Sequence, residues 1–365
     1  MKKIGMTCLT GILLLSFSTE SFARQWSLND CIRYALENNI QLKKAKLKEY
    51  SALEDVKQSQ AALLPSLNFS TSQNVSYNPW PEKGRATVAD GYVQSSADKV
   101  YYNGSYSLIG NWTVWNGNKN TNTLKLNKLA TEQAKLDSAV TANSVLEQIA
   151  QLYVQILYSN EAISVSQESL KTSQTNEERG KTMVNVGKMS KADLAQLTAQ
   201  RAQDEYNIVE AESNLKNYKR QLKQILQIAD NEEFDVTIPS TTDQMALKSV
   251  PDMNDVYLAS LEQRPEIKNA KLGIESSDLS IKIAKAGKLP SISMNAGLST
   301  STTSMSKSGW DNQIKNNFTL GGGVTISIPL FDNRQTKTAV NKAMIQKQDY
   351  LLDLQDKQTT LYSTV

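Results

Sequence analysis

The sequence predicts a mixed α+β protein in which long helices alternate with two pairs of β-strands. Three observations support this fold class: a long stretch without glycine or proline, four stretches in which polar and apolar residues alternate, and an internal repeat. The long stretch runs from Asn118 to Arg179, between Gly117 and Gly180. A helix rises about 1.5 Å per residue, so an unbroken helix here would be on the order of 90 Å long. Such a rod is too long for the interior of a compact domain.

A second helical arm is expected after a short turn. Gly187 suits the left-handed residue that ends a helix, and Ser190 followed by Asp193 resembles the start of another. Glycine and proline are then absent until Pro239, so residues 117–229 are expected to form a long antiparallel hairpin. Residues of the second arm follow steps of three and four, as in a coiled-coil seam. The seam consists of Leu194, Leu197, Arg201, Asp204, Ile208, Ala211, Leu215, Tyr218, Leu222 and Ile225.

The residues before and after Pro65 have different periods. A helical pattern covers residues 24–64, whereas the residues from Ser66 alternate with a period of two. This alternation is typical of a strand with one polar and one apolar face. A second alternating stretch ends near Trp115, so residues 65–116 are expected to form the first pair of strands. The polar face of the first strand contains Ser66, Asn68 and Ser70, and its apolar face contains Leu67 and Phe69.

The same order of helix and strands returns later in the chain. When Pro65 is aligned with Pro290, an offset of 225 residues, the match extends without a gap back to Ser27 and Asp252. Runs that match at one offset indicate an internal duplication.

The second copy is expected to follow a linker over residues 230–251. It comprises a helix over 252–289 and a second pair of strands over 290–331. Residues 332–365 begin another long helix, whose return arm is missing. The chain is therefore expected to be partial. The polar face of the third strand contains Ser291, Ser293 and Asn295.

The four alternating stretches are long enough to cross a bilayer at a tilt. Aromatic residues gather near their ends, which suits the interface between lipid and water. Four strands cannot close a sheet within one chain, and open edges in lipid would leave backbone groups unpaired. We therefore expect identical copies to complete the sheet as a ring. A water-soluble sandwich, whose strands also alternate, is the alternative.

The N-terminus predicts export. Lys2 and Lys3 precede an apolar run, and Ala23 ends a small-residue cleavage sequence, so residues 1–23 are expected to be a signal peptide. Cleavage would leave Cys31 as the single cysteine, which cannot form an internal disulfide and is expected to be buried.

Composition argues against several classes of function. The chain has no histidine, the commonest metal ligand and the usual general base, and its net charge is only +3. Glu177 and Glu178 are expected to be solvated charges, and the glycines from Gly321 to Gly323 lie within an alternating strand, where a phosphate-binding loop would not be found. We therefore expect no enzymatic activity, no cofactor, no metal and no nucleic-acid partner.

Several features together resemble one family. They are the duplicated Leu-Pro-Ser junction between helix and strand, the run from Arg264 to Ile267, and the turn from Val186 to Asp193. The chain resembles an outer-membrane factor of the TolC type over nearly all of its length after the signal peptide. The resemblance implies a homotrimer with a 12-stranded barrel in contact with outer-membrane lipid of a Gram-negative bacterium. The long helices would form a tunnel through the periplasm.

The resemblance also implies a function. The expected protein is the outer membrane channel of a tripartite efflux pump or type I secretion system, a passive conduit for export. It would reach an inner-membrane pump through a periplasmic adaptor, also called a membrane fusion protein. No gate residues are assigned, because the family's closing residues come largely from the missing return arm. A soluble periplasmic coiled-coil scaffold or adaptor is the alternative function.

Two sets of site residues follow from this resemblance and from the strand pattern. The hairpin tip that docks on the adaptor would contain Val186, Gly187, Ser190 and Asp193. The lumen of the barrel would be lined by Ser66, Asn68, Ser70, Ser291, Ser293 and Asn295.

Overall fold

The helical hairpin and the strands predicted from the sequence are both present in the computed structural model. The structure describes residues 24–80, 86–89, 92–95, 99–229, 234–239 and 251–365, so the expected signal peptide lies outside the described residues. The chain divides into two units, Met1–Lys43 with Thr141–Lys248 and Lys44–Val140 with Ser249–Val365. Within the described residues, no helix combines the length and apolarity needed to span a membrane.

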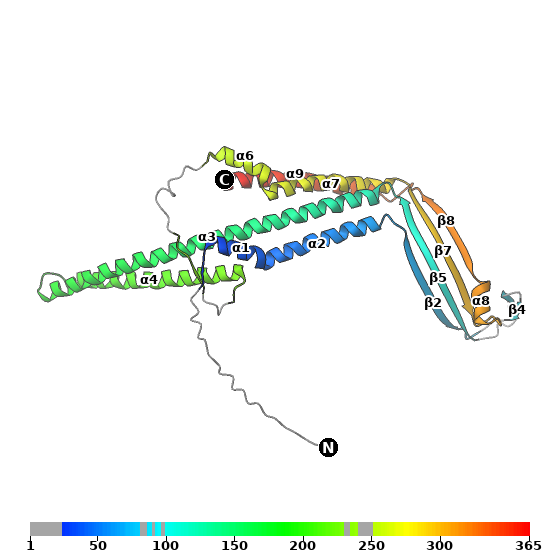
Figure 1. Cartoon of the computed structure of the whole chain (residues 1–365), viewed down its shortest axis with the longest axis horizontal. Coiled ribbons are helices and arrows are strands. Elements are labelled where there is room, and N and C mark those ends of the chain that lie inside the picture. Colours follow the sequence, from blue (N-terminus) through cyan, green and yellow to red (C-terminus); the bar gives the residue numbers. More distant parts are fainter. Residues whose placement is uncertain (1–23, 81–85, 90–91, 96–98, 230–233, 240–250) are drawn as a thin grey trace, which may run out of the picture. The chain divides into compact units, whose positions relative to one another are not determined.

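The hairpin of the first unit consists of the C-terminal part of α3 (Lys119–Asn185) and α4 (Lys191–Leu226) (Figure 1). Gly180, which follows the stretch without glycine or proline, lies inside α3. A Cβ atom at Gly180 would lie 2.7 Å from Cδ1 of Leu197. This glycine therefore allows the two arms to pack closely and does not end the helix. The predicted seam of α4 is confirmed, because all of its residues are buried or half-buried.

The helix expected over residues 24–64 is divided into α1 (Leu28–Asn38) and α2 (Ile40–Ala61). Asn39 separates them in an extended conformation, with φ −60° and ψ 128°. Its side chain accepts a hydrogen bond from the backbone N–H of Gln41 at 2.8 Å and donates one to the carbonyl of Ile225 at 2.9 Å. Asn39 thus caps α2 and ties the break to α4, which offsets the lost helical bonds.

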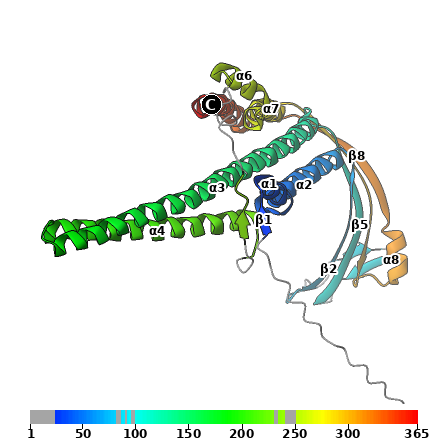
Figure 2. The same cartoon turned by 60° about the vertical axis from the view of Figure 1, so that its left-hand side comes forward.

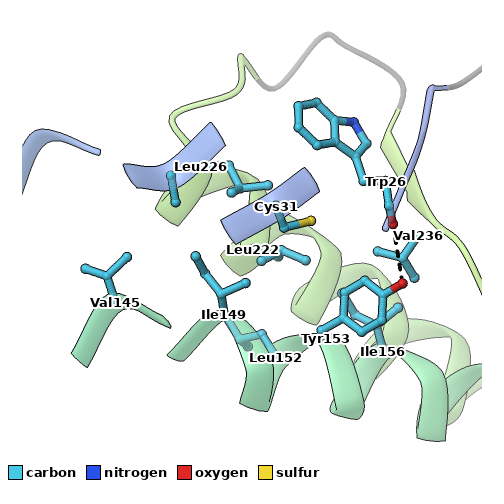
Figure 3. Close-up of a cluster of buried hydrophobic side chains, with 11 residues drawn as sticks. Trp26, Cys31, Val145, Ile149, Leu152, Tyr153, Ile156, Leu222, Leu226 and Val236 are labelled. Atoms are coloured by element: carbon cyan, nitrogen blue, oxygen red, sulfur yellow. Dashed lines mark hydrogen bonds between the residues drawn. The ribbon is translucent and has the colours of Figure 1, made fainter. Parts of the chain in front are cut away.

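The hydrophobic core of the first unit lies between α1, α3 and α4 (Figure 3). A short parallel pair of strands, β1 (Arg24–Trp26) and β6 (Phe234–Val236), borders this core. Neither strand has a signal in the sequence pattern, because three residues are too few to show a period. Cys31 is buried as expected, and burial raises the pKa of its thiol to about 11. The core contains Trp26, Cys31, Ala35, Val145, Ile149, Leu152, Tyr153, Ile156, Leu222, Leu226 and Val236.

The four predicted strands form one antiparallel sheet in the second unit, in the order β2-β5-β7-β8 (Figure 1). Figure 2 shows the same sheet from another side. The alternation predicted that the fourth strand continues to Phe331, but it ends at Ser327. Pro329 follows closely and lacks an N–H group for a strand bond. The strands are β2 (Ser66–Tyr77), β5 (Val100–Trp115), β7 (Ser291–Thr303) and β8 (Thr319–Ser327).

Two small elements near the far end of the sheet were not predicted. They are a hairpin of β3 (Ala86–Ala89) and β4 (Tyr92–Ser95), and the short helix α8 (Trp310–Asn316). The helices of the second unit are the C-terminal part of α2, the N-terminal part of α3, α6 (Met253–Gln263), α7 (Pro265–Lys285), the 3₁₀ turn η1 (Ala286–Lys288) and α9 (Gln335–Thr364).

The internal duplication extends to the details of the helix ends. Ser27 and Asp252, which match at the offset of 225 residues, both cap a helix with their side chains. Asn39 and Arg264 also match, and Arg264 breaks the second copy with φ −62° and ψ 127°. The helix expected over residues 252–289 is therefore divided like the first. Pro265 begins α7, where its missing N–H has no helical partner to lose.

Candidate functional site

The register of the sheet places polar residues together on one face. Paired residues of antiparallel strands lie on the same face. Ser70 of β2 pairs with Ser107 of β5, which pairs with Ser299 of β7, which pairs with Thr319 of β8. The hydroxyl oxygens of Ser70 and Ser107 are 2.7 Å apart. This row of hydroxyl groups crosses the whole sheet.

All six residues expected to line the lumen lie on this polar face. Ser66 and Asn295 share one row through Asn111 of β5. Ile109, which pairs with Asn68, is an apolar exception. None of the four strands contains a charged residue. The face therefore offers neutral hydrogen-bonding groups. The six residues are Ser66, Asn68 and Ser70 of β2 and Ser291, Ser293 and Asn295 of β7.

The opposite face of the sheet is apolar and largely uncovered. Phe69, Leu108, Leu298 and Leu320 form one row across it. Phe69 is 67% exposed and Leu320 is 75% exposed. Soluble monomers rarely expose apolar patches of more than a few hundred Å². Other exposed apolar residues on this face are Leu67, Val75, Tyr77, Val324 and Ile326.

The two outer strands have free edges. β2 and β8 each pair with one neighbour in the described part of the chain, so their other sides carry unpaired backbone groups. Such an edge is a template for pairing with another strand. Within one chain, the sheet therefore lacks a cover for its apolar face and does not close into a barrel.

The four residues expected at the hairpin tip lie in one exposed turn. Gly187 has φ +72°, a conformation that favours glycine, and a Cβ atom there would have no neighbour within 4 Å. The hydroxyl oxygen of Ser190 accepts a hydrogen bond from the backbone N–H of Asp193 at 3.1 Å and begins α4. Val186 is 62% exposed. The backbone fixes this turn, and its side chains remain accessible.

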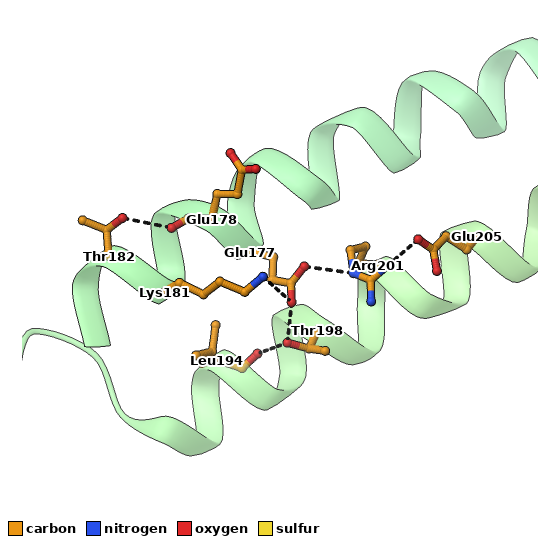
Figure 4. A network of polar contacts seen from close by, with 8 residues as sticks. All are labelled: Glu177, Glu178, Lys181, Thr182, Leu194, Thr198, Arg201 and Glu205. Carbon is orange, nitrogen blue, oxygen red and sulfur yellow. Dashed lines mark hydrogen bonds and ion pairs between the residues drawn. The ribbon is translucent and has the colours of Figure 1, made fainter. Parts of the chain in front are cut away.

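A network of charged groups joins the two arms of the hairpin (Figure 4). Glu177 of α3, expected to be solvated, is only 6% exposed. One of its oxygens lies 2.9 Å from Nε of Arg201 in α4, and the other accepts a hydrogen bond from Oγ1 of Thr198 at 2.9 Å and lies 3.2 Å from Nζ of Lys181. The bond from Thr198, together with Lys181 and Arg201, holds the pKa of Glu177 below its ordinary value. Arg201 also forms an ion pair with Glu205.

The position of Arg201 was the signal that the sequence offered for this network. Arg201 and Asp204 interrupt an otherwise apolar seam, and a charge facing the other arm needs a partner there. Glu177 supplies that partner. In the part of the chain that the structure describes, no three His, Cys, Asp or Glu side chains gather as a metal site would require.

A charge-free sheet with one apolar face, open edges and an attached helical hairpin defines a β-sheet membrane protein with a helical extension. The chain belongs to the outer membrane efflux protein family, whose model matches residues 31–226 and 256–365. Its place is therefore the outer membrane, with a helical extension in the periplasm.

Comparisons with individual proteins agree with this family. A toxin and drug export protein A of Aggregatibacter actinomycetemcomitans is 24% identical over 325 residues, which cover 88% of this chain and 65% of that relative. This chain thus spans less than two thirds of the relative's length. A solved structure of CusC has a TM-score of 0.73 at 18% identity and covers 94% of this chain and 75% of its own. The CmeC outer membrane channel of Campylobacter jejuni has a TM-score of 0.72 at 21% identity, covering 91% of this chain and 68% of its own. These two likenesses show the fold.

Proposed function

We propose that this protein is a passive conduit for export across the outer membrane, as the channel of a tripartite efflux pump or type I secretion system. The observation that carries the proposal is the uncovered two-faced sheet. Its apolar face needs lipid, and its free edges need strands from other copies. Three copies would supply 12 strands, enough to close a barrel around an aqueous lumen.

The polar face supports a conduit of low selectivity. In a barrel with the apolar face outward, the hydroxyl and amide groups of Ser66, Asn68, Ser70, Ser291, Ser293 and Asn295 line the lumen. Rings of charge select ions in many channels, and the strands carry none. Solutes of either sign can therefore pass, and a pump in the inner membrane supplies the energy.

The hairpin tip supports a docking role toward a periplasmic adaptor. Val186, Gly187, Ser190 and Asp193 belong to an exposed turn whose shape depends on backbone bonds and a helix cap. Val186 is exposed and its side chain makes none of these bonds, so its substitution would leave the turn folded and its surface is free to serve recognition. The adaptor links the channel to the pump.

Conductance and assembly test the proposal together. We expect the purified full-length chain in detergent to be a trimer by native mass spectrometry and to form long-lived conducting pores in planar lipid bilayers. A water-soluble monomer without conductance, released with the periplasmic fraction, would overturn the proposal in favour of a soluble scaffold.

Cysteine labelling tests which face lines the lumen. We expect Ser70→Cys and Asn295→Cys to react with a charged, water-soluble thiol reagent in reconstituted pores and to lose conductance. Phe69→Cys, on the opposite face, should react slowly because lipid covers it. The native Cys31 provides a low background, since it is fully buried and its thiol pKa is about 11. Equal labelling at Ser70→Cys and Phe69→Cys would contradict the assignment of faces.

A further inference from the structure

Basic residues gather where the sheet joins the helices. We define the foot of the sheet as the end at which β2 and β7 begin and β5 and β8 end. Three of the four segments that join the foot to helices are 116–130, 279–291 and 327–345. They contain nine basic residues and one acidic residue, Asp332. We call the nine basic residues the collar: Lys119, Lys125, Lys128, Lys282, Lys285, Lys288, Arg334, Lys337 and Lys342.

The collar residues are available to a ligand. All nine are exposed. None forms an ion pair with a carboxylate among the described residues, in contrast to Lys347, which lies 2.7 Å from Asp278 farther along α9. The carboxylate of Asp332 accepts a hydrogen bond from the backbone N–H of Thr336 in the first turn of α9 at 2.8 Å. The collar therefore carries nearly uncompensated positive charge.

The charge is specific to this end of the sheet. The fourth segment at the foot, the end of α2, adds Glu54, Asp55 and Lys57, of which Glu54 and Lys57 pair at 2.7 Å. At the opposite end, the described residues of the segments 78–99 and 304–318 contain three basic residues and one acidic residue, namely Lys99, Lys307, Lys315 and Asp311. Among the described residues, the foot is thus strongly basic and the opposite end carries little net charge.

Two collar residues lie on a side of α3 that its neighbouring helices leave open. Asn120 donates a hydrogen bond to the carbonyl of Ala62 after α2, and Gln133 donates one to Asn269 of α7. Successive residues of a helix are rotated by about 100°. Lys125 and Lys128 therefore point away from both neighbours.

Exposed apolar residues adjoin the collar. Ile328 is 59%, Leu330 is 94% and Phe331 is 86% exposed, and Arg334 and Lys337 lie three and six residues after Phe331. An apolar band followed by long basic side chains is the order met on passing from lipid tails to phosphate groups, since lysine and arginine extend toward the interface.

We propose that the collar binds the phosphate groups of anionic glycerophospholipids in the periplasmic leaflet of the outer membrane. The proposal rests on the proposed function, which places the sheet in that membrane and the foot at its periplasmic side. Positive charge attracts the negative phosphodiester, and a nearby basic residue contributes about 1 kcal/mol to such binding. The near absence of carboxylates in the three collar segments matters equally, because a carboxylate would repel a lipid of net negative charge.

Lipid retention by the full-length protein tests the proposal. The protein in neutral detergent is titrated with phosphatidylglycerol or phosphatidylcholine, and bound lipids are counted by native mass spectrometry. We expect phosphatidylglycerol to bind about tenfold more tightly at low salt and the preference to weaken at high salt. The collar variant Lys125→Gln, Lys128→Gln, Lys282→Gln, Lys285→Gln should lose most of this preference. The control variant Lys43→Gln, Lys44→Gln, Lys171→Gln, Lys216→Gln removes the same charge from exposed positions away from the foot and should keep it.

Each outcome has a definite meaning. Equal binding of the two lipids by the wild-type protein, or an unchanged preference in the collar variant, overturns the proposal. Competition by glycerol phosphate as strong as that by the lipid would identify a site for free phosphate and also overturn it. If the collar variant changes only the ratio of anion to cation permeability in bilayers, the collar faces the conduit and the lipid assignment is wrong. Trimers that conduct without lipid preference leave the proposed function intact, whereas a protein that never conducts contradicts that function itself.

Discussion

Val145 and Val165 offer a matched test of the core because both lie in α3. Val145 is 1% exposed within the core of the first unit, and Val165 is 59% exposed. We expect Val145→Ala to lower the free energy of unfolding by about 2 kcal/mol, through lost burial and a residual cavity. Val165→Ala should change it by less than about 0.5 kcal/mol. Urea denaturation followed by circular dichroism measures both, and equal effects would show that the hairpin has no defined core at Val145.

Glu177 gives the hairpin a dependence on pH. Its folded pKa is lowered, first by the hydrogen bond from Thr198 and then by Lys181. The stabilisation is therefore present above the unfolded value of about 4.3 and is lost as the pH falls through the lower folded value. We expect Glu177→Gln to lower the melting temperature at pH 7, and this disadvantage to shrink progressively as the pH is lowered below about 4.3.

Glu178→Gln is the control for this pH effect. Glu178 is exposed beside Glu177, and its carboxylate has no ion-pair partner in the described residues. Its substitution should leave the melting temperature nearly unchanged at both pH values. A difference between wild type and Glu177→Gln that does not shrink at any pH below about 4.3 would contradict the role of the charge.

The sequence predicts single residues well where one local rule decides their structure. Gly187 and Ser190 were predicted because a left-handed turn and a helix cap depend on a few neighbouring backbone groups. Glu177 was misjudged because its burial depends on Arg201, which is distant in the sequence and adjacent only after the hairpin closes. The hydroxyl face was predicted from the alternation alone. The row from Ser70 to Thr319 could be identified only from the pairing of the strands in the structure.

At the scale of elements, Gly180 shows how close packing of one arm restricts the size of a side chain in the other. The atom nearest to a Cβ at this position is the end of the flexible Leu197 side chain. Gly180→Ala gains about 1 kcal/mol of helix propensity and displaces that leucine, so we expect a net change within about 1 kcal/mol. Gly180→Phe cannot be accommodated so easily and should destabilise the hairpin by about 1–3 kcal/mol.

Thermal unfolding of the two Gly180 variants measures this effect. A phenylalanine variant as stable as the alanine variant would show that the arms are not in close contact at Gly180. A helix that ended at Gly180 would also tolerate both substitutions, since neither side chain would meet α4.

Long periodic elements were predictable, and short ones were not. The strands β2, β5, β7 and β8 and the two arms of the hairpin each repeat their pattern many times. By contrast, β1 and β6 have three residues each, and α8 has seven. The breaks at Asn39 and Arg264 were missed because the apolar pattern continues across them. The bonds that Asn39 makes with Gln41 and Ile225 show why the first break is stable.

At the scale of the whole molecule, the sheet presents adjacent residues to different surroundings. Phe69 and Ser70 are neighbours in β2, but Phe69 belongs to the apolar row with Leu320 and Ser70 to the hydroxyl row with Thr319. In the proposed barrel, Phe69 faces lipid and Ser70 faces the aqueous lumen. A soluble sandwich would instead bury Phe69 against a second layer and leave Ser70 in bulk water, without a pore.

Arginine at each of these two positions tests that difference. Phe69→Arg should destabilise the assembled protein in lipid by about 2–4 kcal/mol, because a charge is costly near the middle of the bilayer. We expect its trimer to dissociate at a lower temperature in lipid nanodiscs. Ser70→Arg should leave the trimer intact and shift the permeability of the pore toward anions, since the new charge can stay hydrated in the lumen. If both variants dissociate at the same temperature and neither alters ion selectivity, the two faces of the sheet do not separate lipid from water.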